Sequence, residues 1–155
     1  MTMGVVLALF GAAISIIGGG IGTIIGTLYV GTSGAGLVAS KPKLFGLVLL
    51  LAALPSSQGI YGFLGSILIL QKTGILSGEI QALSTEAGLL FLAAALPVAL
   101  LGGFSGAGQG KVLQSGLRVI ANNAGNVGQA VILGVLMESM AVFGLLLTIL
   151  IVNAA

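Results

Sequence analysis

One carboxylate, Glu138, lies near the middle of an apolar run that covers residues 127–152. A charged side chain at the centre of a membrane helix costs about 2.5–3.5 kcal/mol on insertion scales, so such residues normally face a helix bundle or a water path and mark a route for ions. Glu138 therefore predicts ion chemistry in this segment. The competing interpretation is a protonated, hydrogen-bonded glutamic acid that only holds two helices together.

A second apolar segment carries polar side chains at a comparable depth. Leu54, Ser57, Gln58 and Tyr61 are spaced i, i+3, i+4 and i+7, which places them on one face of a helix. Pro55 removes an amide donor and strains the preceding turn, so a carbonyl near it can turn toward a ligand. The simpler alternative is that the serine and the glutamine bond to neighbouring backbone.

A third apolar segment contributes Gln109, where surrounding glycines allow another helix to come close. Together these segments offer the anionic oxygen of Glu138, the amide oxygens of Gln58 and Gln109, the Ser57 hydroxyl and a carbonyl near Pro55. Such a set suits a dehydrated monovalent cation, because one carboxylate is too little charge for a buried divalent ion. The surplus of oxygens favours Na⁺ over H⁺, although amides that bond to each other leave the proton open.

The composition places the chain in a membrane. Of its 155 residues, 57% are hydrophobic and 5% are charged, which is too few solvating groups to cover a water-soluble globule of this size. Four apolar stretches each exceed the roughly 20 residues that span hydrocarbon: 5–38, 44–70, 89–120 and 127–152. The sequence therefore predicts an all-α membrane protein with four transmembrane helices.

The two halves of the chain resemble each other. A single shift along the sequence aligns Gln58 with Glu138 and Phe63 with Phe143, and each half contains a short turn. This pattern predicts two duplicated helical hairpins: residues 1–72, an external connection at 73–86, and an ion-carrying hairpin at 87–155. Because Gln58 stands where the carboxylate is expected, the four helices share one ionisable group.

Several function classes are excluded by what the sequence lacks. The chain has no cysteine and no histidine, which excludes disulfides and the common zinc and haem ligands. A net charge of +2, without a basic run interleaved with aromatics, argues against nucleic-acid binding. The glycine-rich runs lack the lysine and the serine or threonine of a phosphate cradle, so we expect ATP hydrolysis to take place on another protein.

Glycines recur every four residues on one face of the first apolar stretch, at Gly18, Gly22 and Gly26. Such a stripe lets helix backbones approach closely in a membrane. A generic dimer contact would use one stripe of this kind. The density of glycine in this segment favours a crowded ring of many helices instead.

The distribution of charge predicts the orientation in the membrane. The external connection and its flanks hold Lys72 together with Glu79 and Glu86, which we expect to be solvated. By the positive-inside tendency, the two short turns face the cytoplasm and both termini face outward. Four cations lie in or toward those short turns: Lys41, Lys43, Lys111 and Arg118. Among these, Lys111 is expected to extend to the membrane interface.

Three motifs in order, LPSSQGIYGF, FSGAGQGKV and LMESMAVFG, make the chain similar to the proteolipid rotor subunit (subunit K or c) of V-type ATPases, and most of all to the sodium-translocating bacterial type. The resemblance covers essentially the whole chain. It implies a homo-oligomeric ring that lies in membrane lipid and turns against a stator membrane subunit with an arginine. A soluble ATPase head would drive the turning through a central-stalk subunit, so this chain itself would be non-catalytic.

The resemblance also implies residue roles. Glu138 would carry the ion, and Tyr61 would hydrogen-bond its carboxylate to lock the loaded site. The remaining ligands would be the Leu54 carbonyl and the side chains of Ser57, Gln58 and Gln109. The sodium type has threonine where this chain has serine, so the hydroxyl is kept but the methyl that fixes its rotamer is lost. We therefore expect a similar but looser site.

Two other functions fit parts of the pattern. The first is a rotor of the same architecture with H⁺ as the coupling ion, which would show no sodium dependence. The second is a small four-helix drug/proton antiporter, which also uses a lone membrane glutamate. Antiporters of that kind are expected to surround a cationic drug with aromatic side chains, whereas this chain has no tryptophan and its carboxylate lies in the last helix.

Overall fold

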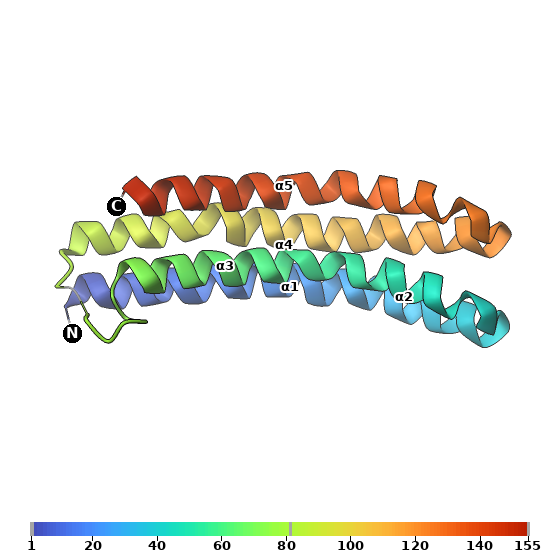
Figure 1. The fold of residues 1–155 in the computed structure, drawn as a ribbon, viewed down its shortest axis with the longest axis horizontal. Coiled ribbons are helices and arrows are strands. Elements are labelled where there is room, and N and C mark those ends of the chain that lie inside the picture. The colour runs from blue at the N-terminus through green and yellow to red at the C-terminus, as the bar shows by residue number, and fades with distance from the viewer. Residues whose placement is uncertain (1, 81, 155) are drawn as a thin grey trace.

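The computed structural model describes residues 2–80 and 82–154, so Met1, Gln81 and Ala155 lie outside the described residues. Four long helical spans run side by side as two hairpins (Figure 1). All four are long and apolar enough to cross a membrane. The all-helical, four-span fold predicted from the sequence is therefore confirmed.

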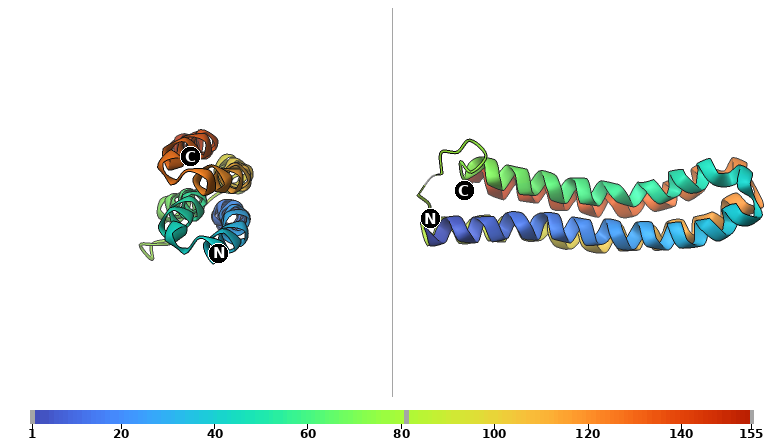
Figure 2. Two further views of the ribbon diagram at one scale, coloured as in Figure 1. Left: turned by 90° about the vertical axis from the view of Figure 1, so that its right-hand side faces the viewer. Right: turned by 90° about the horizontal axis from the view of Figure 1, so that it is seen from below.

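The first and third spans are single long helices, α1 (Met3–Ser40) and α4 (Thr85–Asn122). The second span is broken into four pieces: η1 (Pro42–Leu44), α2 (Phe45–Ala53), η2 (Leu54–Ser56) and α3 (Ser57–Lys72). The fourth span consists of η3 (Ala124–Asn126) and α5 (Val127–Ala154). An end-on view shows two layers, with α1 beside α4 in one layer and α3 beside α5 in the other (Figure 2).

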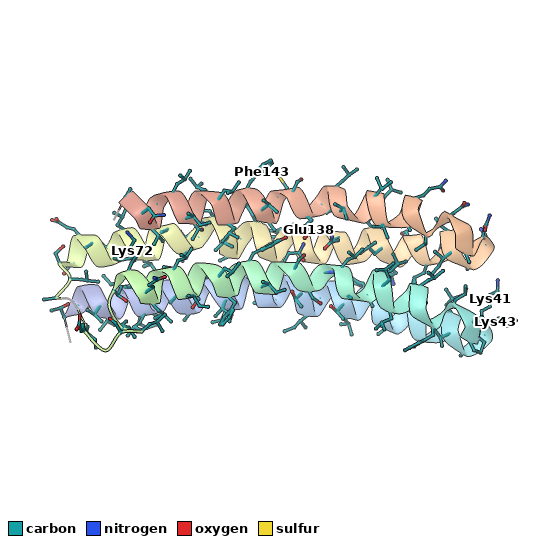
Figure 3. All side chains as sticks on the ribbon, viewed as in Figure 1. Lys41, Lys43, Lys72, Glu138 and Phe143 are labelled. Carbon is teal, nitrogen blue, oxygen red and sulfur yellow. The ribbon has the colours of Figure 1, made fainter. Side chains whose placement is uncertain are left out.

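The two short turns lie at one end of the bundle, and the chain termini lie at the other (Figure 1). Lys41 and Lys43 mark the end with the turns, and Lys72 lies toward the opposite end (Figure 3). The connection between the hairpins ends earlier than predicted, because α4 begins at Thr85. The Ser84 hydroxyl caps that helix by accepting a hydrogen bond of 3.1 Å from the Ala87 amide, and a serine in this role favours a helix start.

Helices α1 and α4 approach each other through glycine. A Cβ added to Gly106 would lie 2.6 Å from the Gly22 carbonyl carbon, so the two backbones touch with no side chain between them. Gly18, Gly22 and Gly26 all face α4, and Gly26 also meets Pro55 of the second span. Within one chain, the glycine stripe thus allows the close packing of the two longest helices.

The backbone repeat differs in register from the alignment predicted by residue type. The long helices end at Ser40 and at Asn122, and the 3-10 turns that follow begin at Pro42 and at Ala124. This register pairs Gln58 with Met140, whereas the predicted alignment paired it with Glu138. Two residues of α-helix correspond to a rotation of about 200°, so Gln58 and Glu138 leave their helices on different faces.

Two apolar clusters fill the interior on either side of a polar layer. One, near the termini, includes Ala8, Ile69 and Phe91. The other, near the turns, includes Leu51 and Leu113. Both are fully shielded from solvent at their centres, so they fix the relative heights of the four spans. This packing therefore also determines the heights at which the polar side chains of the layer between the clusters meet.

Candidate ion-binding site

The local break in the second span positions the first group of polar atoms. Pro55 lies inside η2, where the missing amide and the ring disfavour a regular α-helix. The Leu54 carbonyl accepts hydrogen bonds from the Ser57 amide and from the Ser57 hydroxyl, the latter at 3.1 Å. Residues 54–57 therefore present a carbonyl and a hydroxyl at the same point.

A continuous chain of hydrogen bonds leads from this break across three helices. The Ser57 hydroxyl has a single proton, for which Gln58 Oε1 at 3.3 Å is a second acceptor beside the Leu54 carbonyl, and Gln58 Nε2 donates to Gln109 Oε1 at 3.0 Å. Gln109 Nε2 in turn lies 3.5 Å from Glu138 Oε2. The Tyr61 hydroxyl donates to the other carboxylate oxygen, Glu138 Oε1, at 2.8 Å. All the side chains predicted to form the site thus belong to one network.

The members of this network differ in burial. Gln58 and Gln109 are 0% exposed, whereas Glu138 and Tyr61 are partly exposed. Figure 3 shows Glu138 away from both ends of the bundle, and its hydrogen bond with Tyr61 links α5 to α3. The carboxylate therefore lies at the boundary between the buried glutamines and the outer surface of the helices.

The two buried amides satisfy each other, as buried polar groups must. An amide oxygen has two lone pairs, so Gln58 Oε1 and Gln109 Oε1 each keep one acceptor position after the bonds described above. With the Leu54 carbonyl, the Ser57 hydroxyl and the Glu138 carboxylate, they form an all-oxygen donor set. Oxygen donors are those preferred by hard cations.

Two segments of the chain, residues 10–69 and 92–151, each match the family of the ATP synthase C subunit. The chain belongs to this family. The first match begins at residue 10 and the second at residue 92, which is the same register that pairs the helix end at Ser40 with the helix end at Asn122. The predicted duplication into two hairpins is confirmed by this double match.

Two relatives of this C-subunit protein match almost the whole of it. The V-type sodium ATPase subunit K of Enterococcus hirae is 36% identical over 149 residues, which are 96% of this chain and 92% of that protein. The A-type ATP synthase subunit K of Methanocaldococcus jannaschii is 38% identical over 145 residues, or 94% of this chain and 61% of that protein. The predicted resemblance to V-type proteolipids is confirmed: the chain is a non-catalytic membrane rotor subunit of a V/A-type ATPase that moves ions.

The surroundings of the carboxylate explain how a membrane protein tolerates it. Along α5, the neighbouring Leu136 and Met140 are 66% and 45% exposed, so Glu138 lies at an otherwise apolar surface. An unpaired charge at such a surface is costly, whereas a neutralised carboxylate is much less so. Neutralisation of Glu138 would therefore favour its position at this surface of the C-subunit protein.

Two contacts in this C-subunit protein were not indicated by the sequence alone. The Lys111 ammonium lies 5.3 Å from the centre of the Tyr29 ring, a cation–π contact between α4 and α1. The Thr23 hydroxyl of α1 bonds to the backbone on both sides of the break at Pro55. A threonine next to the glycine stripe, at the depth of a proline in the neighbouring helix, was the signal available for the second contact.

Proposed function

We propose that this rotor protein carries Na⁺ across the membrane by binding it reversibly at Glu138 while a ring of such proteins rotates. The observation that carries the proposal is the hydrogen-bonded network from Ser57 through Gln58 and Gln109 to Glu138 and Tyr61. Side chains of α3 and α4 meet the carboxylate of α5 in this network, which supports a binding site at that point. Glu138 supplies the charge, and the neutral oxygens replace the hydration shell of the ion.

The richness of the donor set favours Na⁺ over H⁺. A proton carrier needs one carboxyl group and one or two hydrogen-bond partners, and Tyr61 alone supplies such a partner. Two fully buried glutamines are costly additions unless their oxygens have a task. The Enterococcus hirae relative is a V-type sodium ATPase subunit, which agrees with this choice.

The proton alternative draws on one observation of its own. The Gln58 amide donates to the Gln109 oxygen at 3.0 Å, so the amides are satisfied without any ion between them. In that case they are structural, and Glu138 carries a proton that Tyr61 orients. Sodium dependence distinguishes the two functions directly.

The mechanism follows from the net charge of the site. With Na⁺ bound, the carboxylate is neutralised and its surface is compatible with lipid. After the ion leaves, the charged Glu138 has to face an aqueous path or a fixed positive charge, for which an arginine of a stator membrane subunit is suited. Alternation between these environments couples ion flow to rotation, which a soluble ATPase head drives through a central-stalk subunit.

The charge distribution supports an orientation for this machine in the cell membrane. Lys41 and Lys43 lie at the end with the short turns. The other end holds the connection between α3 and α4, which contains the exposed Glu79, and the first turn of α4, which contains the exposed Glu86. We place the turns in the cytoplasm, toward the ATPase head, and both termini outside. Because the chain has no cysteine, Gly125→Cys and Glu79→Cys report the two sides separately. An impermeant thiol reagent added outside intact cells should label only the variant at 79, and labelling at 125 alone would reverse the orientation.

The test of the coupling ion is carbodiimide labelling of Glu138 in the purified ring at neutral pH. Millimolar Na⁺ should protect the carboxylate, because the bound ion and its ligands occlude the reactive oxygens. Choline chloride at the same ionic strength is the control and should not protect. Labelling that responds only to pH, and equally to both salts, would replace Na⁺ by H⁺ in this proposal.

A further inference from the structure

The side chain of Thr23 is inserted into the backbone of the broken second span. Its hydroxyl donates to the Pro55 carbonyl at 2.7 Å and accepts from the Gly59 amide at 2.9 Å. In an unbroken α-helix a carbonyl pairs with the amide four residues later, so these two groups would bond to each other. Here the regular α3 helix begins only at Ser57, and the Thr23 hydroxyl joins the two groups from the neighbouring helix.

This insertion lies in the middle of the ion-binding residues. Leu54 directly precedes Pro55, and Ser57 and Gln58 lie between the two backbone groups that Thr23 holds. Tyr61 follows within the same turn of α3. A side chain that enters the hydrogen-bond ladder of a helix bends it and redirects the carbonyls nearby. The separation between Pro55 and Gly59 therefore sets the directions of the site's groups on this helix.

Gly59 and the side chain of Thr23 itself both favour this contact. A Cβ on Gly59 would lie 3.0 Å from the Thr23 hydroxyl oxygen, closer than side chains normally pack, so glycine leaves the room that the hydroxyl occupies. Threonine has a stiff χ1 angle, which limits the movement of the hydroxyl. By contrast, Thr27, one turn further along α1, has a buried hydroxyl oxygen without a hydrogen-bond partner among the described residues.

We propose that Thr23 is a positioning residue of the ion site: through its two backbone bonds it holds the Leu54 carbonyl and the Ser57–Tyr61 turn in the geometry that binds Na⁺. This inference rests on the proposed function of Glu138. Thr23 itself lies on α1, and both hydrogen bonds of its hydroxyl go to backbone groups of the second span, so it acts through that span. It gives α1 a task in ion binding beyond close packing.

The test compares Thr23→Val, Thr23→Ser and the matched control Thr27→Val in the assembled ring. The valine at 23 removes both hydrogen bonds at nearly constant volume, and we expect about tenfold more Na⁺ to be needed for half-protection of Glu138. Serine restores the hydroxyl and should remain within about twofold of the unmodified protein, as should Thr27→Val, whose hydroxyl has no bond to lose among the described residues. Unchanged protection in an assembled Thr23→Val ring, or an equal effect of both valines, overturns the proposal.

Hydrogen exchange of the segment 54–61 gives a readout that does not depend on the ion. Thr23→Val should speed exchange in this segment at least fivefold relative to Thr27→Val, because the Gly59 amide loses its acceptor. If Na⁺ fails to protect the unmodified protein, the coupling ion is wrong, and equal exchange in the two variants then also overturns the role of Thr23. Should Thr23→Val not fold, Gly59→Ala crowds the same hydroxyl, with a Cβ 3.0 Å from its oxygen, while favouring the helix by propensity; faster exchange in 54–61 together with wild-type Na⁺ protection in that variant overturns the proposal.

Discussion

Replacing Gln58 and Gln109 by methionine, singly and together, separates the structural role of the amides from a role in binding the ion. Both side chains are 0% exposed, and they bond to each other at 3.0 Å. Either single variant leaves a buried amide without its partner, which costs about 1–3 kcal/mol of folding free energy. The double variant removes both polar groups and fills the space with side chains of similar shape, so its stability should return close to that of the unmodified protein.

Ion binding should not recover in the same way. Each single variant removes one neutral oxygen from the donor set, and a loss of about 1–3 kcal/mol corresponds to a Na⁺ affinity about 5- to 150-fold weaker. The double variant lacks two oxygens and should bind Na⁺ no better than either single variant. Compared with the single variants, the double variant should therefore gain stability without gaining ion affinity.

Two measurements on the detergent-solubilised protein check this prediction: thermal unfolding for stability, and the Na⁺ concentration that half-protects Glu138 from carbodiimide. The control is Gln114→Met. Gln114 lies on α4, as Gln109 does, but outside the site, and its amide donates to the Ser33 hydroxyl of α1. This control should leave protection by Na⁺ unchanged. Wild-type protection in the double variant would show that the amides are not ligands, and a double variant less stable than both single variants would refute their pairing.

Three further changes test other parts of the site and the fold. Tyr61→Phe removes the 2.8 Å bond to Glu138 and should weaken Na⁺ protection about tenfold, since a hydrogen bond to a charged group contributes about 1.5–3 kcal/mol; unaltered protection would exclude the locking role. Glu138→Gln keeps an oxygen that can accept the Tyr61 bond, so the ring should assemble while ATP-driven Na⁺ uptake into vesicles stops, whereas a lost ring would favour a structural glutamate. Gly106→Ala places a methyl 2.6 Å from the Gly22 backbone and should lower stability by about 1–3 kcal/mol in thermal unfolding of single chains in detergent. The control is Gly31→Ala, because Gly31 has open space around it in the described residues. Equal stability of the two variants would contradict the close packing of α1 and α4.

The parts of this structure that depend on local pattern were predictable from the sequence. Apolar length alone predicted four spans, because a membrane helix needs about 20 apolar residues. The helical spacing of Leu54, Ser57, Gln58 and Tyr61 placed them on one face, and the structure brings that face against Gln109 and Glu138. Their roles as ion ligands stay predictions.

The parts that depend on register between helices were not predictable in this way. Residue type aligned Gln58 with Glu138, but the helix ends and the two family matches give a register that differs by two residues. The packing of two complete hairpins determines the register, and two matched residue types are too few to predict it. The bonds of Thr23 also depend on the height of α1 relative to α3, which two buried apolar clusters determine and no single motif reveals.

The duplicated hairpins place their polar side chains at different burial. Gln58 is sealed in the interior of the bundle, whereas Glu138 lies at the surface of α5. Register alone does not produce this difference, because Met140, which pairs with Gln58 in the backbone repeat, is 45% exposed. A neutral amide is suited to the sealed position, where a charge would be costly, and the carboxylate is suited to the surface, where the proposed exchange of its ion requires access. In the proposed site, the first hairpin would supply Ser57, Gln58 and the Tyr61 hydroxyl, and the second would supply Gln109 and the charge of Glu138, so both hairpins are needed where α3, α4 and α5 meet.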